Sequence, residues 1–121
     1  MKRSSKIILT VAVVAVAAIA VFFVCYEPKR SGNPVFEGWY ADPEGVVFGD
    51  TYWIYPTWSK PFPEQLHFDA FSSKDLVSWQ KHERIIDQSS ISWLTHALWA
   101  PSIIEKEGKY YLMFSCNDVH E

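Results

Sequence analysis

The chain has 121 residues, of which 49% are hydrophobic, 17% aromatic and 21% charged, a balance typical of a globular protein and not of a disordered one. Its net charge of -3 offers no basic surface to nucleic acid, so we expect no nucleic-acid partner. The four histidines lack metal-ligand spacing, the two cysteines form no disulfide framework, and no glycine-rich phosphate loop is present. We therefore expect neither a metal nor a cofactor.

Residues 1–25 have the pattern of an export signal or membrane anchor. Three basic residues precede an uncharged run over residues 7–24, and these 18 residues are long for a signal-peptide core and just long enough for a membrane span. Small residues suited to cleavage lie inside the run, which favours an uncleaved anchor over a removed signal. Cys25, directly after the run, leaves a lipoprotein signal as a further alternative. Because a basic flank stays in the cytoplasm, we expect an exported bacterial protein that is membrane-anchored, periplasmic or extracellular.

Residues 26–32 have no apolar period and predict a polar linker, so the globular part begins near Asn33. Beyond it, short runs rich in β-branched and aromatic residues alternate with turn residues, and no helical period is sustained. The expected strands are residues 45–48, 51–55, 68–72, 103–104 and 109–114, with a polar turn over residues 74–79 leading into one more strand. The sequence predicts an all-β domain over residues 33–121, preceded by one hydrophobic helix.

An internal repeat organises this domain. Pro43 is followed nine positions later by Tyr52, and Pro101 is followed nine positions later by Tyr110. The second proline and the second tyrosine thus each lie 58 residues after the first. A period of this length holds enough strand for one four-stranded sheet, which is the blade of a β-propeller. We expect a partial β-propeller made of its first one to two blades. Two similar hairpins in a β-sandwich remain the alternative.

A carboxylate beside large aromatic rings predicts a sugar-binding site. Asp42 stands in the segment Gly38-Trp39-Tyr40-Ala41-Asp42-Pro43, where the proline favours an extended conformation for Asp42 at the mouth of a strand. A turn-forming role is the simpler alternative for such an aspartate. Indole and phenol rings can stack on the apolar face of a sugar, and the rings expected near the ligand are Trp39, Tyr40, Trp58 and Trp99.

The motifs, taken in series, resemble the opening of a glycoside hydrolase of family 43. They are Asn33-Pro34-Val35, Ala41-Asp42-Pro43, the run from Phe71 to Trp79, Trp99-Ala100-Pro101, and Gly108-Lys109-Tyr110-Tyr111-Leu112. The resemblance implies a five-bladed propeller that hydrolyses arabinose- or xylose-containing polysaccharides or oligosaccharides with inversion at the anomeric carbon. It matches Asp42 to the general base, a role that suits an aspartate ionised at neutral pH.

The chain departs from this family in length. Residues 33–121 hold about one and a half periods, whereas a closed ring needs at least about four blades. No residue matches the general acid or the aspartate that tunes it, because the carboxylates of the second period lie in turn or terminal positions, namely Glu105, Glu107, Asp118 and Glu121. We expect an inactive N-terminal fragment of a larger enzyme and make no prediction of its oligomeric state.

Two alternatives stay open for the function. The first is a non-catalytic, cell-surface propeller that binds carbohydrate through the aromatic platform. The second is a propeller hydrolase acting on fructosides, against which Ala41 argues, because those families usually place asparagine before the Asp-Pro pair.

Overall fold

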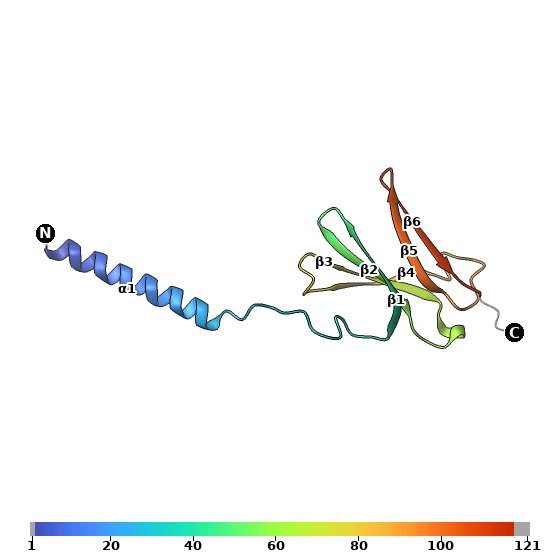
Figure 1. The fold of residues 1–121 in the computed structure, drawn as a ribbon, viewed down its shortest axis with the longest axis horizontal. Coiled ribbons are helices and arrows are strands. Elements are labelled where there is room, and N and C mark those ends of the chain that lie inside the picture. Colours follow the sequence, from blue (N-terminus) through green and yellow to red (C-terminus); the bar gives the residue numbers. More distant parts are fainter. Residues whose placement is uncertain (1, 118–121) are drawn as a thin grey trace. The chain divides into compact units, whose positions relative to one another are not determined.

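The computed structural model describes residues 2–117, in which one helix precedes two antiparallel sheets (Figure 1). Asp118 and Glu121, weighed above as carboxylates of the second period, lie outside the described residues. The chain divides into two compact units, Met1–Arg30 and Ser31–Glu121. The second unit carries the candidate site.

The first unit is built on α1 (Lys2–Cys25). Alanine and leucine favour the helix, and the valines and isoleucines of the run are tolerated because no proline or glycine interrupts it. Within the part of the chain that the structure describes, no helix has both the length and the apolar character needed to cross a membrane. The anchor expected from the sequence stays a prediction.

The first sheet of the second unit has the order β1-β2-β3-β4, and each neighbouring pair is antiparallel. Its strands are β1 (Tyr40–Phe48), β2 (Thr51–Trp58), β3 (His67–Ser73) and β4 (Gln80–Asp87), with a short 3-10 helix, η1 (Phe62–Glu64), between β2 and β3. This up-and-down sheet is the predicted first blade, and its strands include those expected from the sequence.

The second sheet pairs β5 (Trp99–Lys106) with β6 (Lys109–Ser115). Tight turns close both this hairpin and the β1-β2 hairpin, and both need a backbone with positive φ, which Gly49 (φ 61°) and Gly108 (φ 72°) provide at no steric cost. The hairpins expected around Gly49-Asp50 and Glu107-Gly108 are thereby confirmed. The β5-β6 pair is the beginning of the second repeat.

The hydrophobic core lies where the two sheets meet. Phe68 of β3 is fully buried, and it clusters with three buried side chains from the segment between β4 and β5, namely Ile91, Leu94 and Leu98. Leu112 and Phe114 of β6 pack against this cluster. Burying one such side chain contributes about 1.5–3 kcal/mol, so the core holds the β5-β6 pair against the first sheet. A site with residues from both sheets is therefore held in place.

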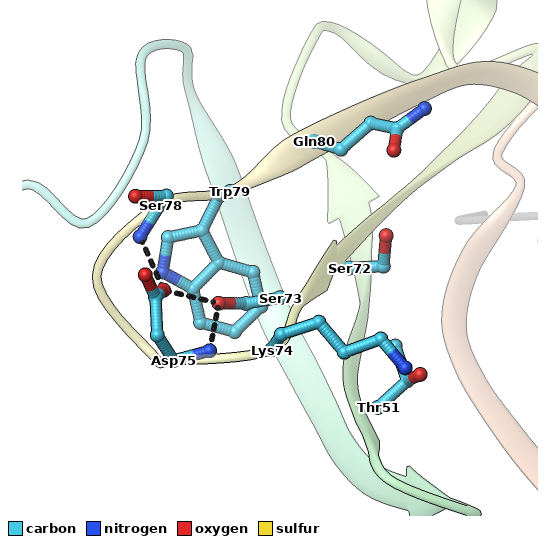
Figure 2. A pocket seen from close by; sticks show the side chains of 8 residues that line it. All are labelled: Thr51, Ser72, Ser73, Lys74, Asp75, Ser78, Trp79 and Gln80. Carbon is cyan, nitrogen blue, oxygen red and sulfur yellow. Dashed lines mark hydrogen bonds between the residues drawn. The ribbon is translucent and has the colours of Figure 1, made fainter.

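The turn between β3 and β4 contains a hollow of about 370 Å³, which Figure 2 shows from close by. Two of its polar side chains, Asp75 and Ser73, are committed to the turn itself. Asp75 Oδ1 accepts backbone N–H groups from Ser78 at 2.7 Å and Val77 at 2.9 Å, and these bonds lower the pKa of Asp75 to about 2. Ser73 Oγ accepts the N–H of Asp75 at 3.2 Å. The hollow is a product of the turn that the sequence predicts at this point, and it presents no candidate chemistry.

Candidate active site

Asp42 lies in an irregularity of the first blade. The pairing of β1 with β2 shifts between Ala41 and Glu44, and within this bulge Asp42 has φ 45°. The prediction that Pro43 holds Asp42 extended is therefore wrong. A bulge needs a residue outside the extended region, and Asp is among the side chains that enter the left-handed region most readily. The bulge redirects the carboxylate away from the regular alternation of the strand.

The redirected side chain lines a cavity of about 170 Å³ between the two sheets. Trp99, the first residue of β5, lines the same cavity, so a carboxylate of the first repeat and an indole of the second share one space. The remaining lining residues are Ala41, Thr57, Ser59, Phe62 and Gln65. Among the predicted site residues, the structure brings together Asp42 and Trp99.

Trp39 lies in an adjoining hollow of about 480 Å³, which shares Ser59 and Gln65 with the Asp42 cavity. Its ring is available for stacking, because the residue is 78% exposed. The backbone is nevertheless held: the Ser59 N–H donates to the Trp39 carbonyl at 2.9 Å. The two hollows thus form a continuous surface that carries one carboxylate and an exposed indole.

Tyr40 and Trp58 lie elsewhere. They pair with each other across β1 and β2, whereas the next pair along is Ala41 with Thr57, and alternate pairs face opposite sides of a sheet. The Tyr40 hydroxyl donates to Asp69 Oδ2 at 2.7 Å, and burial together with this bond raises the pKa of Tyr40. The structure does not bring Tyr40 to the cavity, and its ring packs against Phe71 instead.

The Trp58 ring packs against a histidine on that same face. Its centroid lies 4.1 Å from the centroid of His67, and Lys60 Nζ lies 5.5 Å above the indole. Trp58 is absent from the lining of the Asp42 cavity. Because side chains alternate along a strand, Trp58 faces the side of the sheet opposite Thr57. The prediction that Trp58 faces the ligand is therefore not supported by the structure.

A buried charge on that face ties three strands together. Asp69 of β3 is 1% exposed and accepts the Arg84 N–H at 2.9 Å, besides the Tyr40 hydroxyl, and Lys81 Nζ lies 3.1 Å from Asp69 Oδ2. Burial alone would raise the pKa of Asp69, but these donors together hold it below its ordinary value. The cluster links β1, β3 and β4 beneath the site and is structural.

Sequence reasoning missed three polar side chains of the cavity wall, Thr57, Ser59 and Gln65. Gln65 is 7% exposed, and its Nε2 donates to the Lys60 carbonyl at 2.8 Å, while its Oε1 has no hydrogen-bond partner among the described residues. A buried acceptor without a donor costs about 1–3 kcal/mol, which makes Gln65 a candidate for binding a ligand hydroxyl. In the sequence, the loop after Trp58 shows only turn-forming prolines, so no local pattern indicates Gln65 as a binding residue.

Comparisons with known proteins identify the family of the chain. The family model "Glycosyl hydrolases family 43" matches residues 31–121. A beta-D-galactofuranosidase, xynD, from Aspergillus niger is 50% identical over 99 residues, covering 74% of this chain and 29% of that protein. A xylosidase/arabinosidase from Bacteroides ovatus is 28% identical over 93 residues, covering 67% of this chain and 29% of that protein. The chain therefore spans less than a third of the length of these relatives.

Solved structures show the same likeness. The structure of RS223-beta-xylosidase superposes with a TM-score of 0.58 at 28% identity, covering 67% of this chain and 29% of the other. CoXyl43, a beta-xylosidase/alpha-arabinofuranosidase from a compost microbial metagenome solved with xylotriose, gives a TM-score of 0.57 at 26% identity, covering 76% of this chain and 30% of the other.

Proposed function

This chain belongs to glycosyl hydrolase family 43, and from that premise we propose that it supplies the general base of an inverting glycoside hydrolase. The substrate class is furanosides or xylosides in arabinose- or xylose-containing polysaccharides and oligosaccharides. The general base is Asp42, which takes a proton from the water that attacks the anomeric carbon. Relatives named as xylosidase/arabinosidases support this class, and the relative named as a galactofuranosidase supports only its furanoside part.

The observation that carries the proposal is the position of the Asp42 carboxylate. It lies in a cavity between two sheets, with an indole in the cavity wall, and not in the interior of a turn. A carboxylate held there can activate water while a sugar ring stacks on Trp99. Trp39 and the unpaired Gln65 Oε1 extend the surface along the adjoining hollow and offer contacts to further sugar units.

An inverting reaction also needs a protonated carboxyl about 6.5–9.5 Å from the base, so that water fits between the two. Within residues 2–117, Asp42 is the only carboxylate that lines the cavity. We therefore assign the acid to a part of the full-length enzyme outside these residues, and we expect the 121-residue chain to be inactive by itself.

The test measures the anomeric configuration of the first product formed by the full-length enzyme that carries these residues. A chimera that joins residues 31–121 to the rest of the 50%-identical relative is an equivalent source. Aryl arabinofuranoside, xyloside and galactofuranoside are offered separately, and proton NMR is recorded before mutarotation. We expect hydrolysis of at least one, with the inverted anomer appearing first. A retained anomer would exclude the mechanism, and binding of all three without turnover would favour a carbohydrate-binding module.

A further inference from the structure

The bulge that carries Asp42 recurs in the second sheet. The β1-β2 register shifts between Ala41 and Glu44, and the β5-β6 register shifts between Trp99 and Ser102, one 58-residue repeat later in the chain. Ala100 takes the place of Asp42 in this second bulge, and its φ of 47° is close to the 45° of Asp42. The two bulges are equivalent in backbone, but only the first carries a carboxylate.

One side chain links the two bulges. Thr57 of β2 is 2% exposed, and its Oγ1 accepts the Ala100 N–H at 2.8 Å and lies 3.4 Å from Asp42 Oδ2. An amide N–H can only donate, so the Thr57 oxygen must accept from Ala100. The single hydroxyl proton then remains for the Asp42 carboxylate. Thr57 Oγ1 therefore accepts a hydrogen bond from the Ala100 N–H and donates one to Asp42 Oδ2.

The position of the hydroxyl is itself fixed. Thr57 pairs with Ala41 in the last regular pair of the β1-β2 ladder before the bulge, and a β-branched residue has few side-chain rotamers. The bond to Asp42 is long, as is common in ligand-free sites, where such bonds tighten once substrate binds. Thr57 thus ties the orientation of the first-sheet carboxylate to the backbone of the second sheet.

We propose that Thr57 is the positioning residue for Asp42, holding Oδ2 so that the carboxylate keeps one orientation toward the attacking water. This inference rests on the proposed function, because it needs Asp42 to act as the base. It predicts a specific kinetic effect: the chemical step slows when the hydroxyl is lost, while substrate binding through the aromatic residues is retained.

The test compares Thr57→Val with Thr57→Ser in the full-length enzyme. Valine keeps the shape and removes the hydroxyl, and we expect kcat to fall about 10- to 100-fold with KM changed less than about threefold, since a misplacement near 1 Å costs about 10²-fold. Serine keeps the hydroxyl and should hold kcat within about threefold of the wild type. Thr51→Val, on the same strand and face but at the β1-β2 hairpin, is the matched control and should leave both constants unchanged.

The outcomes separate the two proposals. Wild-type kcat in Thr57→Val, or equal losses in the valine and serine variants, would overturn the positioning role. Should Thr57→Val fail to melt cooperatively, Thr57→Ala gives the same comparison, because it removes the hydroxyl without placing a new branch beside the carboxylate. An Asp42→Asn enzyme assayed in parallel identifies the other failure: if it turns over normally, the proposed function itself fails, whatever Thr57 does.

Discussion

Asp42→Asn is expected to lower kcat of the full-length enzyme by about 10³-fold, within the range that general-base catalysis contributes. The carboxamide keeps the size and shape of the side chain and can still occupy the cavity wall, but it cannot take a proton from water. Binding should therefore survive. We expect the Kd for an uncleaved oligosaccharide, measured by calorimetry, to stay within about threefold of the wild type.

The control for this variant is Asp50→Asn. Asp50 lies at the β1-β2 hairpin of the same sheet, where its exposed carboxylate pairs with Lys74. It should leave both kcat and Kd unchanged. A wild-type turnover rate in Asp42→Asn would show that another group activates the water, and a parallel loss of binding would show that Asp42 holds the sugar and does not serve only to activate the water.

The second large effect concerns stability. Asp69→Asn is expected to lower the free energy of unfolding by about 2–3 kcal/mol, measured by denaturant titration of the full-length enzyme. The carboxylate accepts three donors through two oxygens, and asparagine retains one acceptor oxygen, so a buried N–H or hydroxyl loses its partner. The loss stays below that of a fully buried ion pair, because the Lys81 side chain is 40% exposed.

A matched control uses the other carboxylate on the same lysine. Glu83 Oε1 lies 3.2 Å from Lys81 Nζ, but its side chain is 73% exposed. Glu83→Gln should change the free energy of unfolding by less than about 0.5 kcal/mol, as expected for a solvated ion pair. Equal losses in Asp69→Asn and Glu83→Gln would mean that burial adds nothing at Asp69 and would contradict the structural role of its three donors.

The architecture could be predicted because its signals are local. Glycine at both hairpin turns, runs of aromatic and β-branched residues, and the recurrence of Pro43 as Pro101 each lie within a few residues of the feature they indicate. The two bulges are also 58 residues apart, although the sequence reasoning predicted neither of them. Strand existence and blade size followed from these patterns alone.

The site was harder to predict because it depends on register and long-range contact. The bulge at Asp42 sets which side chains of β1 face the cavity. Tyr40 lies on the other face of the sheet, where its hydroxyl donates to Asp69. Thr57 touches a backbone amide 43 residues away, a contact that no neighbouring pattern marks. Asp42 and Trp99, which line one cavity, were predicted as site residues because each stands close to a proline in a motif that resembles the family.

The most direct test of the central claim is a crystal structure of the full-length Asp42→Asn enzyme with an uncleaved oligosaccharide bound. If Asp42 is the base, a sugar ring will occupy the cavity between the two sheets, with a water held by the substituted side chain on the face of the anomeric carbon opposite the bond to be cleaved. A sugar bound elsewhere, or a side chain at this position turned toward its own main chain, would contradict that role.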